Sequence, residues 1–455
     1  MRRGLPTRML IAALLAAGVA LPAGARAETL ADALIAAYRN SNILDQNRAV
    51  LRAADEDVAT AVSSLRPVLQ WVLDSGYSRS SVARSNFSAT LALSGQVVLW
   101  DAGRNKLGVD IAKEAVLSTR EALVQVEQDI LLNAVDAYFM VRSELENVAI
   151  NQNSVRVIGE TLRATQDQFE VGEVTRTDVA LAEAQLASAR AGLAAAEGRL
   201  AAAREVYKAT VGAYPGTLAG APREPALPPS VQAAAALAQR QHPAIRRAQR
   251  EVNLAELRIA AAAAERRPEL TADMSLGLTD GGRNSGSVGL SMSQTIYAGG
   301  RLSAAHRKAI AGRDGARAAL HQTAVEVGQG VATAWANIEV LRAQIVATEQ
   351  QIRAATVAYR GVQEEAKLGA RTTLDVLNAE QSLLDAQASR IEAEAELQVA
   401  IYSLLSAMGL LTVDHLSLGI PTYDAAAYYE AVKSAPATSV QGKSLDRVLQ
   451  AIGRN

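Results

Sequence analysis

Residues 99–104 read LWDAGR, and residues 296–301, which lie 197 positions later, read IYAGGR. The same offset aligns Asp178 with Asp375 and Gly212 with Gly409, and no gap is needed from residue 99 to residue 212. A repeat at one fixed offset indicates that one structural unit occurs twice along the chain. The fold of this unit therefore decides the fold of the protein.

Proline marks the boundary between the two copies. Residues 214–230 hold five of the 12 prolines, whereas residues 68–214 and 269–420 hold none, which permits uninterrupted helix or sheet. We therefore divide the chain into repeat 1 (28–213), a linker (214–230), repeat 2 (231–411) and a C-terminal tail (412–455). Residues 416–455 lie beyond the repeat and either wrap the helices or stay mobile.

Each copy contains two strands of alternating polarity. Apolar and polar residues alternate through 68–78 and 86–99 in repeat 1, and through 269–279 and 287–297 in repeat 2. One face of each strand is apolar and the other rich in Ser and Thr, which suits a tilted strand of an outer-membrane barrel. Trp71, Trp100 and Tyr297 lie near strand ends, where aromatic side chains meet the lipid interface.

Four strands are too few to close a barrel, because the smallest barrels need about eight. A soluble sandwich alternates in the same way, but two separate hairpins make a poor sandwich. Closure must then come from identical copies, and a trimer supplies a 12-stranded barrel.

Long helices follow the strands in both copies. Residues 104–212 and 301–409 each fit two helices that meet at a glycine turn, and helices of this length indicate a coiled coil. Apolar residues recur every seven positions, at Val141, Val148, Val155 and Leu162 in repeat 1 and at Val331, Ile338, Ile345 and Ile352 in repeat 2. Each half therefore joins a short hairpin of strands to a long hairpin of helices.

Composition excludes several kinds of site. The chain has no Cys, four scattered His and a net charge of −1. It therefore offers no thiolate or clustered-histidine metal site and no electrostatic attraction for nucleic acid. Gly442-Lys443-Ser444 lacks the glycine that a phosphate-binding loop needs at position 437, which is Ala. We expect no cofactor, no metal and no catalytic site, and hence no enzyme.

Residues 1–27 have the layout of a secretory signal peptide. Arg2, Arg3 and Arg8 precede an apolar run from Met9 to Leu21, and the segment ends in Ala25-Arg26-Ala27. Cleavage before Glu28 is predicted. No later segment is apolar over about 18 residues, so the mature chain can enter a membrane only through its strands.

The sequence resembles the TolC family of outer-membrane efflux proteins over nearly all of residues 28–415, duplication included. The most specific stretch is 368–380, LGARTTLDVLNAE, supported by the Gly103-Arg104 and Gly300-Arg301 pairs. These motifs and the absence of Cys are closer to the type I secretion members than to the lipoprotein members of drug-efflux systems. The resemblance implies an α+β membrane protein, a homotrimeric β-barrel with four strands per chain that continues into a long α-helical coiled-coil barrel.

The resemblance also implies a function and a location. The chain would be an exit duct in the outer membrane of a Gram-negative bacterium, extending into the periplasm. It would passively conduct substrate from an inner-membrane ABC or proton-driven transporter and a periplasmic adaptor, the membrane fusion protein, to the cell exterior. Type I protein secretion and multidrug efflux both fit. The alternative is a periplasmic or secreted coiled-coil structural protein without a pore.

Specific roles at the helical turns follow from the same resemblance. Asp375 would form the periplasmic aperture as a ring of three carboxylates, with Asn378 in place of a second family Asp. Arg371 would bond Thr177 and Asp178 of the neighbouring hairpin as a closing latch, in which a family Tyr is replaced by Ala366. The adaptor would contact the tips, at Gly172, Glu173, Val174, Gly369 and Ala370. On the residues alone, Arg371 and Asp375 also fit a solvated turn with an N-capping Asp.

Overall fold

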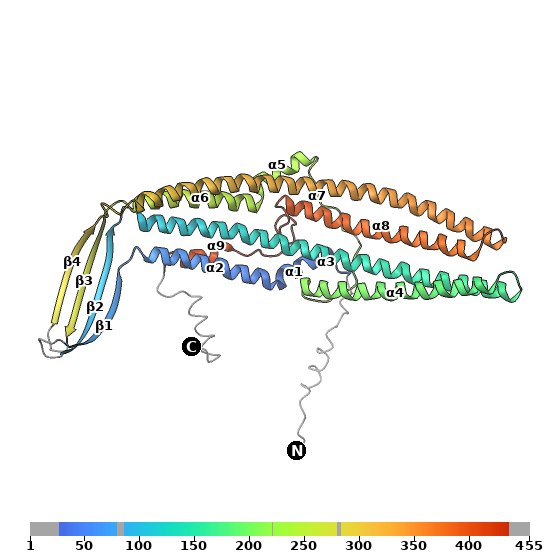
Figure 1. Cartoon of the computed structure of the whole chain (residues 1–455), viewed down its shortest axis with the longest axis horizontal. Helices are drawn as coiled ribbons and strands as arrows, with labels where there is room; N and C mark the ends of the chain where they lie inside the picture. The colour runs from blue at the N-terminus through green and yellow to red at the C-terminus, as the bar shows by residue number, and fades with distance from the viewer. Residues whose placement is uncertain (1–26, 80–85, 221, 280–283, 436–455) are drawn as a thin grey trace, which may run out of the picture. The chain divides into compact units, whose positions relative to one another are not determined.

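A computed structural model describes residues 27–79, 86–220, 222–279 and 284–435 of the chain (Figure 1). The predicted signal peptide up to residue 26 and the Gly442-Lys443-Ser444 segment lie outside the described residues. The chain divides into two compact units. The first holds the residues up to Asn40 together with Asn133–Pro225 and Gln344–Gln398, and the second holds Ser41–Leu132, Ala226–Ala343 and the residues from Val399 onward.

The two repeats have the same order of elements, two short helices, two strands and two long helices. In repeat 1 these are α1 (Leu30–Asn40), α2 (Asn42–Ser63), β1 (Val68–Ser78), β2 (Asn86–Trp100), α3 (Arg104–Glu170) and α4 (Arg176–Val211). In repeat 2 they are α5 (Val231–Gln241), α6 (Pro243–Ala264), β3 (Glu269–Thr279), β4 (Asn284–Ser293), α7 (Arg301–Lys367) and α8 (Thr373–Ala407). The helix α9 (Ala425–Val432) follows in the tail.

The four strands form one antiparallel sheet in the order β1-β2-β3-β4, within the second unit (Figure 1). The two hairpins join through β2 and β3, so the sheet unites strands from both repeats. The strand β4 runs from Asn284 to Ser293, whereas the alternation predicts 287–297. Ser293 pairs with Glu269, the first residue of β3, so residues 294–297 have no partner strand left to pair with. Hydrogen bonding, and not alternation, therefore ends β4.

A β-bulge interrupts β2 near its end. Val98 pairs with Thr271 and Trp100 pairs with Leu270, so Leu99 is the extra residue. A bulge of one residue reverses the alternation that follows it. Trp100 consequently joins the face of the sheet that carries Leu270, the apolar face.

The first unit has its core where α1 and α4 pack together. Ala33, Ala37, Tyr138 and Tyr207 are fully or almost fully buried there. The Tyr207 hydroxyl donates to the Glu28 carboxylate at 2.6 Å, and Tyr138 donates to the Glu28 carbonyl at 3.2 Å. The first residue of the predicted mature chain is therefore fixed to α3 and α4.

The second unit has a separate core in which the tail takes part. Leu51 and Val58 of α2 and Val116 of α3 are buried together, and Tyr423 and Tyr429 of the tail pack against them. The described part of the tail thus forms α9, which contacts α2. Of the helices that the structure describes, none has both the length and the apolar character needed to cross a bilayer.

Candidate functional site

One face of the four-stranded sheet is apolar across its full width. The register aligns Trp71, Leu93 and Leu276 in one row, and Leu69, Gly95, Met274 and Val288 in the next. Leu69, Trp71, Met274, Leu276 and Val288 are solvent-exposed in the single chain, with Val288 at 85% and Trp71 at 69% exposure, and Leu93 is partly exposed. An exposed apolar surface of this breadth marks contact with a membrane or with another protein.

The opposite face of the same strands is polar. Its rows contain Gln70, Ser94, Ser275 and Ser287, which pair directly across the sheet. The Ser275 and Ser287 hydroxyls are hydrogen-bonded at 2.8 Å. A sheet with one apolar and one hydroxyl-rich face has the polarity of a barrel wall between lipid and a wet interior.

The sheet has two open edges. Within the described residues, β1 pairs only with β2 and β4 pairs only with β3, so each edge strand presents unpaired backbone groups. Unpaired backbone groups cannot remain in contact with lipid, so a membrane-embedded sheet must be closed by further strands.

The three predicted interface aromatics differ in position. Trp71 lies within β1, Trp100 is the last residue of β2, and Tyr297 lies beyond the end of β4. All three are exposed, Tyr297 most strongly at 87%. The structure thus leaves each of them free to contact lipid in a single chain, and their assignment as interface residues stays a prediction.

The turn between α3 and α4 carries the first set of predicted tip residues. Gly172 ends α3 in a left-handed conformation (φ 84°), followed by Glu173 and Val174. Thr175 then caps α4, because its hydroxyl accepts from the Asp178 backbone N–H while the Asp178 carboxylate accepts from the Thr175 backbone N–H at 2.9 Å. The Thr175 hydroxyl also donates to the Asp178 carboxylate at 2.7 Å, and this bond, together with that from the Thr175 backbone N–H, holds the pKa of Asp178 below its usual value.

The turn between α7 and α8 repeats this construction 197 residues later. Gly369 has a φ of 74°, and the Asp375 carboxylate accepts from the Thr372 backbone N–H at 3.0 Å and from the Thr372 hydroxyl at 2.9 Å. The Thr372 backbone bond is the main cause of the lowered pKa of Asp375. Both aspartates are therefore the second members of capping boxes whose caps are Thr175 and Thr372, and both are ionised at neutral pH.

Arg371 has a partner that the sequence did not indicate. Its Nε donates to Glu365 Oε2 at 2.9 Å, within the same hairpin, and this contact raises the pKa of Arg371. Among the described contacts of this one chain, Arg371 bonds neither Thr177 nor Asp178. Asn378 lies exposed, one turn beyond Asp375 on α8. The structure thus brings Asp375 and Asn378 together on one helix but leaves the two halves of the predicted latch apart.

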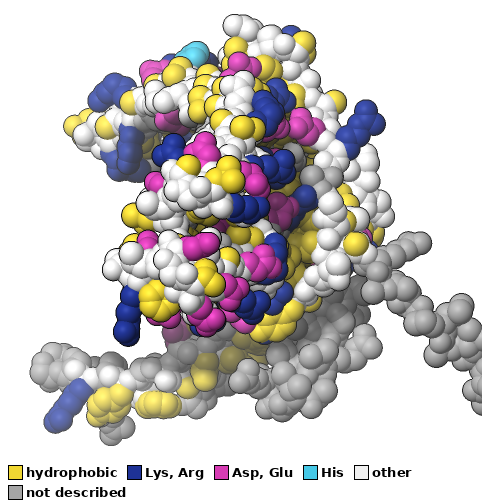
Figure 2. Space-filling model, turned by 90° about the vertical axis from the view of Figure 1, so that its right-hand side faces the viewer, with side chains coloured by type: hydrophobic (Ala, Val, Ile, Leu, Met, Phe, Trp, Pro, Cys, Tyr) yellow, Lys and Arg dark blue, Asp and Glu magenta, His cyan; other side chains and the backbone are white. Residues whose placement is uncertain are grey.

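The end of the molecule that carries the two turns has mixed charge. Figure 2, which views the molecule from this side, shows acidic and basic side chains intermixed with apolar ones. Val171 and Leu368, which directly precede the two turn glycines, are strongly exposed. Exposed apolar residues such as Val171 and Leu368, surrounded by charged side chains, are typical of a surface that contacts another protein.

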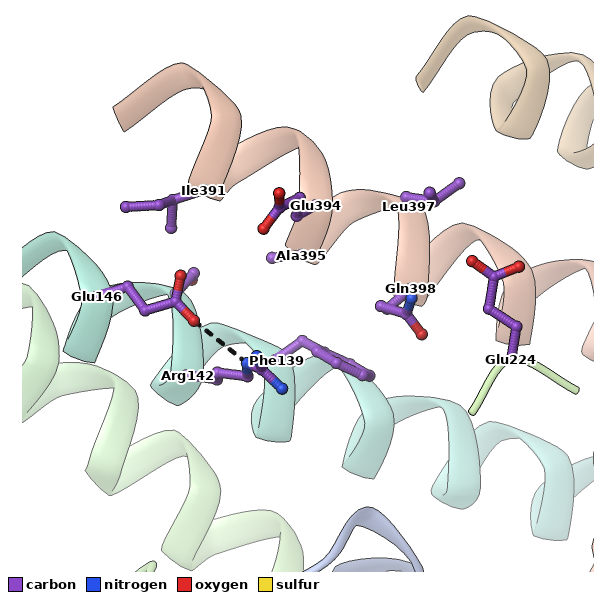
Figure 3. Close-up of a pocket in the computed structure, with 10 residues that line it drawn as sticks. Phe139, Arg142, Glu146, Glu224, Ile391, Glu394, Ala395, Leu397 and Gln398 are labelled. Atoms are coloured by element: carbon purple, nitrogen blue, oxygen red, sulfur yellow. Dashed lines mark hydrogen bonds and ion pairs between the residues drawn. The ribbon is translucent and has the colours of Figure 1, made fainter. Parts of the chain in front are cut away.

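A hollow of about 240 Å³ lies between α3 and α8 in the first unit (Figure 3). Phe139, Arg142 and Glu146 line it from α3, and Glu394 and Gln398 from α8. Arg142 pairs with Glu146 at 3.3 Å. Among the described residues, no group of three or more acidic or histidine side chains is placed to hold a metal ion.

Sequence reasoning missed one buried polar contact near the turns. Ser154 of α3 donates to Glu380 of α8 at 3.4 Å, and both side chains are buried. Glu380 ends the 368–380 stretch, and only its buried position distinguishes it from the many surface glutamates of the helices. A polar residue on the heptad-spaced apolar side of α8 is the signal that would have identified it.

Comparison with known proteins agrees with this architecture. The profile of the family described as "Outer membrane efflux protein" matches residues 34–213 and 234–410, the two repeats. "Outer membrane efflux protein BepC" from Brucella suis is 35% identical over 433 residues, which are 93% of this chain and 95% of that protein. "Outer membrane protein TolC" from Escherichia coli is 26% identical over 391 residues, 80% of this chain and 78% of its own length.

Solved structures show the same fold. A crystal structure of CusC, described in terms of folding and transmembrane channel formation, superposes with a TM-score of 0.75 at 20% identity. It covers 84% of this chain and 92% of its own. The fold and the apolar sheet define the chain as a subunit of an outer-membrane channel. More particularly, the chain belongs to the outer membrane efflux protein family.

Membership confirms the predicted fold class, function and location. The chain is an outer-membrane channel of tripartite efflux and secretion systems, and it extends into the periplasm. Channels of this family are non-enzymatic trimers that work with an adaptor and an inner-membrane transporter. The type I secretion subgroup stays a prediction.

Proposed function

We propose that three copies of this chain form one exit duct, in which β1 of each copy pairs with β4 of the next. The open edges of the sheet carry this proposal, because pairing them satisfies every backbone group that would otherwise face lipid. The apolar face then points to lipid and the hydroxyl-rich face lines a water-filled lumen. Trp71, Trp100 and Tyr297 serve as interface anchors.

The hairpin turns form the periplasmic entrance of this duct. Three copies of Asp375 line the aperture, with Asn378 one turn further along α8. The partly exposed position and lowered pKa of Asp375 support this role, since the side chain keeps its charge at neutral pH. With Asn378 uncharged, a single ring of carboxylates faces a passing cation.

Arg371 closes the entrance by bonding Thr177 and Asp178 of a neighbouring hairpin. A charge-assisted hydrogen bond is stronger than a neutral one and fits a latch. The adaptor contacts the turns at Gly172, Glu173, Val174, Gly369 and Ala370. The exposure of Val171 and Leu368 beside them supplies apolar area for that contact.

The adaptor in this system is a periplasmic membrane fusion protein, and an inner-membrane ABC or proton-driven transporter supplies the energy. We place the chain in the type I protein secretion subgroup, on its Gly-Arg motifs and its lack of Cys. Multidrug efflux is the second candidate for the cargo, because the Brucella relative is named an efflux protein.

Assembly and conduction test the proposal together. Gently solubilised protein should migrate as a heat-modifiable trimer by electrophoresis and mass measurement. The same trimer should conduct ions in planar lipid bilayers. Solitary chains, or trimers that do not insert and conduct, would overturn the proposed pairing of β1 with β4 into a trimeric duct.

A further inference from the structure

Glu380 occupies an unusual position for a carboxylate. It lies on α8, seven residues after the helix begins at Thr373, and only 6% of it is exposed. Its Oε1 accepts the Ser154 hydroxyl at 3.4 Å, a long contact, and its Oε2 has no hydrogen-bond partner among the described residues. A buried carboxylate held by one weak hydrogen bond is costly when it is ionised.

Glu380 lies beside a small contact region between α8 and the α3–α4 hairpin, which we call the seam. Ile158 of α3, Ala182 of α4 and Leu377 of α8 form its buried cluster, with Leu162, Leu186 and Ala189 partly buried around it. This cluster joins the start of α8 to the α3–α4 hairpin. A packed region with few buried side chains opens at low free-energy cost. Ionisation of Glu380 is therefore a large enough change to loosen the packing of this cluster.

Two charged or titratable groups on the neighbouring helices interact with Glu380, Arg156 of α3 and Tyr359 of α7. Glu160 of α3 acts on Tyr359, and the α4 residues of the cluster are apolar. Arg156 donates to Glu160 at 2.9 Å and to Asn153 at 2.7 Å, so its hydrogen bonds go to groups other than Glu380. Burial dominates over these neighbours and raises the pKa of Glu380 to about 7.

We propose that Glu380 is a proton-sensitive positioning residue, which keeps α8 packed against α3 when it is protonated and loosens this seam when it is ionised. The proposal rests on the proposed function only in that the seam lies beside the entrance of the duct. Proton release would then loosen the helix that carries Asp375 and would make the entrance easier to open.

The direction of the pH effect follows from linkage. When the seam opens, Glu380 becomes solvated and its pKa returns toward the ordinary value of 4.5. The packed state is therefore fully stable below about pH 4.5, loses stability as the pH rises toward about 7, and loses no more above that. Each unit of pKa difference changes the opening equilibrium about tenfold.

The absence of Cys makes a direct measurement possible, since Ala182→Cys introduces the only thiol of the chain. The rate at which a neutral maleimide labels this thiol in the intact trimer reports opening of the seam. Rates are measured from pH 5 to pH 8 with Glu380 present and with Glu380→Gln, which mimics the protonated acid. The ratio of the two rates cancels the pH dependence of the thiol itself.

We expect the labelling rate with Glu380, divided by the rate with Glu380→Gln, to rise at least about tenfold between pH 5 and pH 8. Glu392→Gln, which neutralises an exposed carboxylate on the same helix, should behave like the unchanged chain. Ser154→Ala removes the one hydrogen bond that favours the ionised form, so the midpoint should move to higher pH. A ratio that stays flat, or an unmoved midpoint in Ser154→Ala, overturns the proposal.

Conductance separates this inference from the proposed function. A trimer that conducts but shows a flat labelling ratio disproves the role of Glu380 and leaves the duct intact. A trimer with a pH-dependent labelling ratio that never conducts supports the seam and disproves the duct. Heat-modifiable migration of each variant shows that it has assembled.

Discussion

Arg371 shows at the scale of one residue how the entrance can have two states. In the single chain its guanidinium bonds Glu365, and the proposed latch requires it to bond Thr177 and Asp178 of another hairpin instead. Both members of the Arg371–Glu365 pair are about half exposed. Exposed ion pairs contribute little to stability, so exchange of Arg371 between the two partners is energetically cheap.

We predict that Arg371→Ala raises the ion conductance of the trimer in planar bilayers several-fold, because the entrance loses its latch. Glu365→Gln should not raise it, because this change releases Arg371 for the latch. Arg353→Ala, at an exposed pair 3.9 Å from Glu349 on the same helix, is the matched control and should leave conductance unchanged.

Asp178→Ala should raise conductance as well, but it also breaks the capping box of α4. Thr175→Ala removes the same capping box and leaves the latch carboxylate in place, so it controls for fraying of the helix. Unchanged conductance in both Arg371→Ala and Asp178→Ala would discard the latch.

At the scale of the element, the two repeats end their second long helix in related but unequal ways. Gly212 after α4 and Gly409 after α8 both have positive φ, 96° and 77°. A Cβ on Gly212 would lie 2.7 Å from Asn40 Nδ2, a side-chain atom. A Cβ on Gly409 would lie 2.8 Å from His242 Cα, a backbone atom that cannot move without shifting the start of α6.

We therefore predict that Gly409→Ala destabilises the helices more than Gly212→Ala does. The left-handed conformation alone costs a non-glycine residue about 1–2 kcal/mol, and this cost applies at both sites. The backbone clash adds to it only at position 409. Gly198→Ala, inside α4 with open space around it, should instead stabilise by about 0.5–1 kcal/mol.

Denaturant unfolding of the assembled protein, followed by the circular dichroism of its helices, measures all three changes. Equal loss of stability at positions 212 and 409 would show that the contact with His242 does not constrain the turn.

At the scale of the whole molecule, the alternation of apolar and polar residues along each strand gives the sheet one apolar face and one polar face. Leu290 and Ser291 are neighbours in β4, and the register places them on opposite faces. Leu290 lies in the row of Ala272 on the apolar face, and Ser291 lies opposite Thr271 on the polar face. If the proposed duct forms, Leu290 contacts lipid and Ser291 contacts water in the lumen.

We predict that Leu290→Arg reduces the amount of heat-modifiable trimer in outer membranes, because a cation facing the bilayer midplane costs about 2–4 kcal/mol. Ser291→Arg introduces the same charge one residue away and should assemble normally, with an altered ion selectivity in planar bilayers. Quantifying trimer in membrane fractions tests both, and equal losses would mean that the two faces are not lipid and lumen.

Much of this architecture was predictable because its signals are local. The bounds of α3, α4, α7 and α8 follow from heptad spacing and from turn glycines such as Gly172 and Gly369, whose physics involves only nearby residues. The capping role of Asp375 is also local, and the sequence allowed it alongside the role that the family implies, although Thr372 is the cap itself and Asp375 its partner. The strands β1 and β3 have the predicted bounds because the alternation of apolar and polar residues is also a local signal.

The sequence by itself determined the repeat, the type of each element and the one-sided polarity of the strands, because periodicity is written into neighbouring residues. Only the tertiary structure decided where β4 stops, which face Trp100 joins, and that Ser154 meets Glu380 across 226 positions of chain. These outcomes depend on which distant segment supplies the partner. No local pattern encodes the burial that such a partner imposes on a carboxylate.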